Sequence, residues 1–212
     1  MRASVRYITA LVVIAIGIFA IGRGWQIVSF SLAMAGQQTA EERHAIVTHW
    51  GTTPGLASTA LRTALADRID LADQKAANRQ REALIAILSI KPVSAREWMS
   101  LSAVQLITDQ SMDDVLESLK MSTLTGPNEG SVMVERGVYG VSLWEQLSPD
   151  LKSRVATDLI PTLFPRTPGE GQEGGKLRAL VSAQSERVRR ELKQALLASG
   201  VSAGDLEQRL GL

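Results

Sequence analysis

The chain contains no cysteine among its 212 residues. It can therefore contain no disulfide, no cysteine nucleophile and no cysteine-ligated metal site. A protein without cysteine is compatible with both oxidising and reducing compartments, so the composition does not identify its compartment. Aromatic residues make up only 4% of the chain, whereas Leu and Ala supply much of the apolar content. This mixture favours helices over β-sandwiches, whose pleated faces are usually built from β-branched and aromatic residues. We therefore predict an all-α protein.

An excess of charge is also missing. The formal net charge is +1, with 23 basic and 22 acidic residues. Such a balance provides no bulk attraction for nucleic acid. We expect no nucleic-acid partner.

The usual signatures of catalysis and metal binding are absent from the sequence. His44 and His49 are five residues apart, so they do not share a helix face as an i, i+4 metal-binding pair would. The run GEGQEGG has no strand before it and no Lys-Ser/Thr after it, and no G-x-S-x-G occurs. We expect a protein that is not an enzyme, with no catalytic residue, no cofactor and no metal.

The first feature that is present is an apolar N-terminus. Arg2 and Arg6 precede an uncharged run of 16 residues, Tyr7 to Gly22. A helix of that length spans about 24 Å, a little less than the hydrocarbon core of a bilayer, and an interfacial Trp25 extends the usable length. We predict that residues 1–35 form a transmembrane anchor and a juxtamembrane segment.

Two other interpretations of this segment stay open: a cleaved signal peptide and a buried core helix. Small-x-small patterns typical of signal cleavage occur at Ala20 and Gly22, and again at Ala33 and Ala35. If the segment is an anchor, the basic residues that precede the apolar run outnumber the one that follows it. The positive-inside rule then predicts a single-pass protein of the bacterial inner membrane, with a cytoplasmic N-terminus and a periplasmic C-terminal domain.

Residues 36–165 are predicted to form a domain of short helices. Helical apolar spacing and boundary residues predict helices at 39–50, 56–69, 79–91, 95–107, 112–125, 129–144 and 149–160, with a polar stretch at 70–78. Ser94, Asn128 and Ser148 are candidate N-caps, and Gly126 followed by Pro127 is a candidate helix end. Pro149 stands at the first helical position, and Pro161 and Pro165 close the last helix.

A linker and a basic tail complete the chain. The sequence RTPGEGQEGGK, residues 166–176, is rich in Gly, Pro and charge, as linkers are. The segment 177–212 is predicted to hold one long helix, 177–198, and a short one, 203–210. With Lys176 it carries seven basic residues and four acids, a net +3. This tail either packs on the preceding helices or docks on a partner or an anionic surface.

The middle of the chain contains a repeat. Pro92 and Pro127 are 35 residues apart, and a large apolar residue, Trp98 or Met133, follows each of them by six. First-helix positions are occupied by Trp98, Leu101 and Ser102, and second-helix positions by Val115, Leu119, Ser122 and Pro127, with Gly137 at the small position of the next unit. This pattern resembles the tetratricopeptide repeat, a helix-turn-helix of about 34 residues. The resemblance implies helical hairpins that stack to bury their apolar faces.

The phrase TGPNEGSVMVERGVYGVSLWEQLSP resembles small membrane-anchored helical proteins of bacterial surface-polysaccharide assembly. The apolar N-terminus, the repeat-like spacing and the absence of catalytic motifs favour a membrane-anchored adaptor that binds a protein partner in the cell envelope. The resemblance implies an accessory role in surface-polysaccharide assembly. Candidate partner-binding residues are Asn128, Glu129, Arg136 and Tyr139. The alternatives are a glycan- or small-ligand-binding accessory that uses residues 126–144, and an uncharacterised enzyme. Trp98 and Trp144 lie on apolar stripes, which favours core anchors over ligand platforms.

Overall fold

The computed structural model describes residues 2–36, 74–165 and 172–212, together with a few single positions between 42 and 56. It divides into two compact units, Met1–Ile90 and Lys91–Leu212. Every regular element in the described ranges is helical and none is a strand, which confirms the all-α prediction for that part of the chain. Beyond Leu56, the predicted helix 56–69 lies outside the described residues. The predicted helix 39–50 is described at only a few positions, and these are helical: Glu42, Ala45, Ile46, His49 and Trp50.

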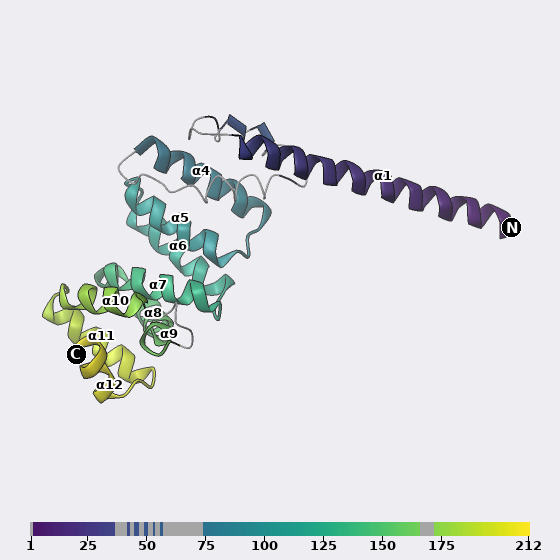
Figure 1. Ribbon diagram of the computed structural model, residues 1–212. Coiled ribbons are helices and arrows are strands. Elements are labelled where there is room, and N and C mark those ends of the chain that lie inside the picture. Colours follow the sequence, from purple (N-terminus) through teal and green to yellow (C-terminus); the bar gives the residue numbers. More distant parts are fainter. Residues whose placement is uncertain are drawn as a thin grey trace. The chain divides into compact units, whose positions relative to one another are not determined.

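The first unit contains a long N-terminal helix, α1 (Arg2–Ala35), and α4 (Gln74–Ile90) (Figure 1). Over Val12–Ala35, α1 is long and apolar enough to cross a membrane. It therefore extends without a break through the uncharged run at 7–22 and through the uncharged residues 27–35 that follow Arg23. Helix α4 begins inside the stretch predicted to be non-helical, because Gln, Lys and Ala favour helices and Ala77 is buried there.

The second unit begins with a hairpin of α5 (Ala95–Ile107) and α6 (Met112–Thr125), which lie side by side (Figure 1). The turn between them includes Asp109, whose φ of 52° is left-handed, a conformation that Asp tolerates better than most residues. Ser111 caps α6 by accepting a hydrogen bond from the amide of Asp114 at 3.2 Å. The predicted helix-turn-helix over 95–125 is confirmed.

The next helices are α7 (Gly130–Ser142), a 3-10 turn η1 (Trp144–Gln146), α8 (Pro149–Asp158) and α9 (Ile160–Leu163). Ser148 and Pro149 start α8 as predicted, with the Ser148 hydroxyl accepting from the amide of Leu151. Pro161 lies in the first turn of α9, where a missing N–H does no harm, so it redirects the chain without ending helical structure.

Two glycines of α7 let α8 approach closely. A Cβ on Gly137 would lie 3.0 Å from the backbone of Asp158 and Leu159, and a Cβ on Gly140 would lie 2.4 Å from Val155. Any larger residue would push the two helices apart.

The tail differs from its predicted form. Residues 172–176 of the predicted linker belong to α10 (Gln172–Ser182), and the predicted helix 177–198 is divided into α10 and α11 (Glu186–Ala198). The division falls at Ser185, whose hydroxyl accepts from the amide of Val188 as an N-cap. The last helix, α12 (Ala203–Leu210), matches its predicted bounds.

These three tail helices are part of the fold of the second unit. Helix α11 packs on α8, and α10 packs on α7 and α12 (Figure 1). One hydrophobic core joins α5–α8 to the tail, and the tail supplies Leu177, Val181, Val188, Leu192, Leu196, Leu206 and Leu210 to it. The interpretation of the tail as helices packed on the preceding ones is confirmed.

Candidate partner-binding surface

The loop between α6 and α7 presents polar side chains to solvent. Asn128 and Glu129 are exposed, and Pro127 is partly exposed. The residue that precedes α7 is Glu129, which makes no side-chain cap, so Asn128 is not the N-cap that its residue type predicted. The loop, residues 126–130, is therefore an exposed polar feature between two packed helices.

Arg136 lies beneath this loop and is fully buried. Its Nε and Nη2 donate to the two carboxylate oxygens of Asp158, at 2.5 and 2.9 Å. Its Nη1 donates to the carbonyl oxygens of Ser122 at 2.9 Å and Gly126 at 3.3 Å. The guanidinium thus adds a second donor to two carbonyls at the end of α6, which also accept the backbone N–H groups of Gly126 and Glu129. Arg136 is placed to hold the loop from below and does not contact solvent.

Asp158, the partner of Arg136, is also fully buried. Burial raises the pKa of its carboxyl, and the hydrogen bonds and charge of Arg136 oppose that rise. Because a buried charge is tolerated only when it is paired and hydrogen-bonded, each of the two side chains requires the other. The pair fastens α7 to the end of α8.

A second contact fixes the last turn of α6, just before the loop, to the start of α5. The Ser122 hydroxyl donates to the carbonyl of Ala95 at 2.8 Å. Gly126 has a φ of −141°, so it is not the left-handed helix end that the Gly-Pro sequence predicted. Glycine is needed at this position because there is no room for a side chain: a Cβ there would lie 2.4 Å from the Cβ of Ala95. The loop is therefore held at its base by three helices.

Tyr139 is half-buried and lies away from the loop. Its hydroxyl donates to the carbonyl of Ser102 at 3.1 Å, and the Ser102 hydroxyl donates to the carbonyl of Val115 at 2.8 Å. Burial raises the pKa of the Tyr139 phenol. Nine residues of α7 separate it from Gly130, which is about 14 Å along a helix. The structure thus brings Asn128 and Glu129 together but separates both from Tyr139.

Three residues that the sequence did not single out extend the exposed surface beside the loop. Arg96 of α5 pairs with Glu135 of α7 at 2.9 Å and donates to the Ser131 hydroxyl at 2.9 Å. The i, i+4 spacing of Ser131 and Glu135 marks one exposed face of α7, but nothing local places Arg96 opposite them. We call Asn128, Glu129, Ser131, Glu135 and Arg96 the loop surface.

The tryptophans and the other predicted repeat positions are mainly structural. Trp144 is buried, and its indole N–H donates to Glu191 at 3.2 Å, an acceptor shared with Lys152 at 2.7 Å. Trp98 is only partly buried, with its indole N–H donating to the carbonyl of Pro92 at 2.8 Å. The other predicted core positions that are buried are Leu101, Val115, Leu119 and Gly137, whereas Pro127 is partly exposed.

The loop surface can form hydrogen bonds and ion pairs with a partner. Across the described ranges no three His, Asp or Glu side chains gather as a metal site would require. His44 lies outside those ranges, and His49 packs edge-to-face on Trp50, with ring centroids 5.7 Å apart. The chain matches no protein-family model, and no curated protein or solved structure is significantly similar to it.

Proposed function

We propose that this protein is a membrane-anchored helical adaptor that binds a protein partner in the bacterial cell envelope through its loop surface. The observation that carries the proposal is the division of polar groups in the second unit. Arg136 and Asp158 are sealed inside it and hold the helices together, while Asn128 and Glu129 stand exposed directly above them. Such a unit supports recognition rather than bond-breaking chemistry.

The rigid base of the loop favours binding. Fixing a flexible loop on association costs free energy, and a loop held in one conformation avoids most of that cost. The contacts of Arg136, Ser122 and Gly126 restrain the loop before any partner arrives. Polar side chains on such a base give specificity through hydrogen bonds and charge complementarity.

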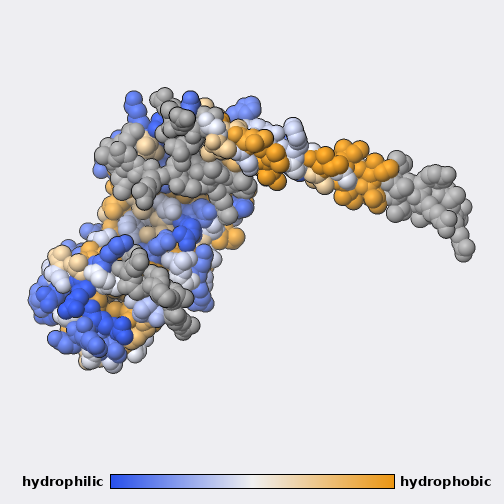
Figure 2. Space-filling view, in the orientation of Figure 1, coloured by the Kyte–Doolittle hydropathy of each residue, from blue (hydrophilic) through white to orange (hydrophobic). Residues whose placement is uncertain are grey.

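The anchor in this proposal is α1, on which large apolar patches alternate with less apolar residues (Figure 2). Its basic N-terminus supports, through the positive-inside rule, a cytoplasmic short end and a periplasmic second unit. The hairpin α5–α6 and the close pair α7–α8 support a stack of hairpins that resembles tetratricopeptide repeats. An accessory role in surface-polysaccharide assembly or export belongs to the same proposal.

A crosslinked pull-down from native membranes, read by mass spectrometry, tests the adaptor. The informative variant is Asn128→Ala/Glu129→Ala, which truncates two exposed side chains without touching the contacts beneath them. Its matched control is Glu207→Ala/Gln208→Ala, which removes an acid and an amide from the exposed face of α12. We expect envelope proteins to be recovered with the wild type and the control, and recovery with the loop variant to fall at least tenfold, equivalent to about 1.4 kcal/mol.

Two results would contradict the adaptor. Equal recovery with the loop variant and the wild type would show that the loop surface does not bind the partner. Failure to recover any specific envelope protein, with the protein folded and in the membrane fraction, would show that the proposed protein partner does not exist.

A further inference from the structure

Helix α1 has one face that the chain itself covers. From Arg23 onward, the covered side includes Gln26, Phe30 and Met34. Phe30 is only 4% exposed and packs edge-on against Trp50, with ring centroids 6.2 Å apart. The end of α1 therefore continues beyond the predicted interface at Trp25 as a helix packed within the first unit.

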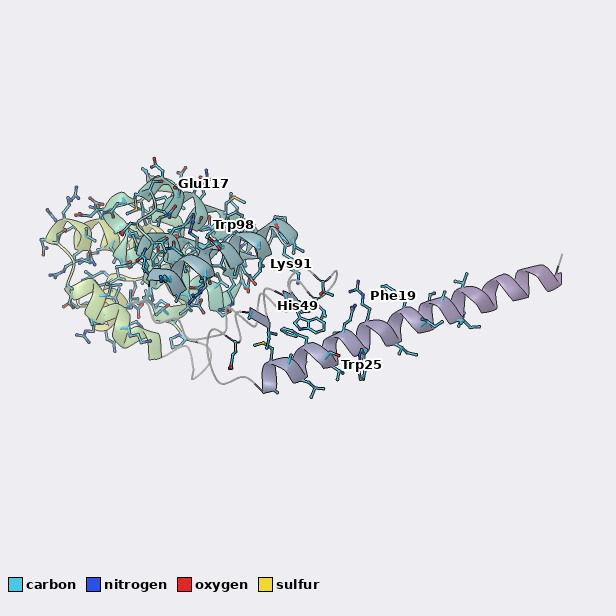
Figure 3. The ribbon with its side chains drawn as sticks, turned by 90° about the horizontal axis from the view of Figure 1, so that it is seen from above. Phe19, Trp25, His49, Lys91, Trp98 and Glu117 are labelled. Carbon is cyan, nitrogen blue, oxygen red and sulfur yellow. The ribbon has the colours of Figure 1, made fainter. Side chains whose placement is uncertain are left out.

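The opposite face carries large apolar side chains that the chain leaves uncovered. They are separated by four, three, four, three and four residues, and their exposed fractions range from 48% to 74%. Figure 3 shows Trp25 projecting from the side of α1 away from His49, whereas Phe19 projects from the side nearer to it. We call this row the α1 seam: Ile14, Ile18, Ile21, Trp25, Val28 and Leu32.

The spacing of the seam is that of a coiled coil. A repeat of 3.5 residues keeps one narrow stripe facing a partner helix, and it corresponds to alternating a and d positions of a heptad. Leu11 precedes Ile14 and Ala35 follows Leu32 in the same register. The period continues from the apolar N-terminal part into the packed end of the helix. Apolar side chains off the seam, such as Ile16 and Ile27, are exposed as well, so what distinguishes the seam is its unbroken heptad period.

Small residues flank the seam on both sides. The heptad positions next to it hold Ala15, Gly17, Gly22, Gly24, Ser29 and Ser31. Glycine lowers helix stability relative to alanine, and a Cβ on any of these three glycines would meet no atom of the chain within 4 Å. The chain's own packing does not require them, whereas two membrane helices approach closely where such residues line the contact.

The charge pattern suits two identical helices. Arg23 is the only charged residue between Tyr7 and Ala40, and its side chain lies among the half-buried residues of the covered face. Two copies aligned in register therefore bring no like charges together. Membrane insertion in a single orientation makes the helices of two copies parallel, which is the arrangement that aligns equal seam positions.

We propose that the α1 seam binds the α1 seam of a second copy of this chain, giving a parallel dimer. The parallel arrangement rests on the proposed membrane anchoring. Burying six seam side chains on each copy removes on the order of 1,000 Å² of apolar surface, which reaches the size of a specific interface. Within the bilayer the contact gains from close packing, and beyond Trp25 it gains from removing Val28 and Leu32 from water. The dimer presents two loop surfaces to a partner.

The absence of cysteine makes a direct test possible in the full-length chain in native membranes. Single cysteines are introduced at seam positions, Ile18→Cys and Val28→Cys, and at matched exposed positions off the seam, Ile16→Cys and Ile27→Cys. A disulfide needs Cα atoms within about 7 Å, which equal seam positions of a parallel pair provide and outward positions do not. After mild oxidation, we expect disulfide-linked dimers from the seam variants and at most a fifth as much from their neighbours.

A second variant tests the flanking glycines. Gly24→Leu in the Val28→Cys background is expected to lower the dimer fraction by about fivefold, because a bulky residue beside the seam separates the helices. Each sample is also extracted with alkaline carbonate, which removes proteins that do not span the membrane. Release by carbonate would refute the anchoring in the proposed function.

If the protein is retained in the membrane, the crosslinking results test the proposed dimer separately from the anchoring. Equal crosslinking at seam and off-seam positions, or none at any position, would overturn the proposed dimer and leave lipid as the covering of the seam. Crosslinking of Val28→Cys to a different protein, with no homodimer, would overturn it in favour of another membrane helix. Dimers that are unaffected by Gly24→Leu would refute the close approach.

Discussion

Removal of the Asp158 carboxylate should destabilise the second unit more than the loss of any surface ion pair. In Asp158→Ala, Arg136 keeps its full burial but loses both oxygens that its Nε and Nη2 contact. Only the carbonyls of Ser122 and Gly126, with the Ser122 hydroxyl, remain around the guanidinium. A positive charge is then left inside the protein without a counterion.

The expected cost follows from burial. Breaking a fully buried pair by removing one partner costs about 3–5 kcal/mol, because the remaining charge stays desolvated. Arg187 and Glu145 form an ion pair of similar length, 2.8 Å, with side chains 64% and 48% exposed. Exposed pairs of this kind contribute little to stability, since water screens both charges. The loss of stability in Asp158→Ala should therefore clearly exceed the loss in Arg187→Ala.

Urea unfolding of the full-length chain in detergent micelles, followed by circular dichroism, measures the difference. With a slope of about 1–3 kcal/mol per molar urea, a cost of about 3–5 kcal/mol should lower the midpoint of Asp158→Ala by roughly 1–5 M. Arg136→Met/Asp158→Leu removes both charges and should unfold at a higher urea concentration than Asp158→Ala. If Asp158→Ala shifts the midpoint no more than Arg187→Ala does, the reasoning from burial is wrong.

Two further predictions concern packing and pH. Gly140→Ala would place a methyl group 2.4 Å from Val155 and should destabilise the chain by about 1–3 kcal/mol in the same urea assay, with Val155→Ala in the same chain restoring part of the loss. The hydrogen bond from Lys152 holds the pKa of the Glu191 carboxyl below its usual range. This contact therefore stabilises the fold at a pH above the ordinary carboxyl pKa, and the stabilisation is lost as the pH falls through the lowered pKa of Glu191. The indole N–H resonance of Trp144, which donates to Glu191, should titrate over that acidic range and stop doing so in Glu191→Gln; a resonance that titrates equally in both proteins would contradict this assignment.

Partner binding and dimerisation use different parts of the chain, so they can be measured separately, although the parallel dimer rests on the proposed membrane anchoring. The loop surface belongs to the second unit, and the seam belongs to α1. If both are correct, a partner with two binding sites would be held by two loops at once, and its apparent affinity would rise without any new contact. Loss of the seam would then weaken capture of such a partner while leaving each loop surface intact.

Local sequence signals were sufficient for much of the helix pattern. Ser148 acts as the N-cap that its residue type predicted, because a hydroxyl at that position accepts from an amide of the first turn, whatever lies elsewhere in the protein. Ser94 also stands at the predicted N-cap position of α5, but its side chain makes no cap. Gly137 stands at the predicted small position, where a Cβ would lie 3.0 Å from the backbone of Asp158 and Leu159. The division at Ser185 was missed because charged residues on both sides continue the helical pattern across it.

The sequence by itself determined the helical class, the apolar N-terminal helix and most helix ends, because these depend on residue type and spacing within a few positions. Only the tertiary structure decided that Arg136 is buried rather than exposed at a groove, since burial requires Asp158, 22 residues away, to face it. It also decided that the tail leucines fill the core of the second unit and that one side of α1 is covered while the seam is not. Each of these features depends on which distant segment of the chain packs against a given helix face. A local pattern of residues does not specify which distant segment that is.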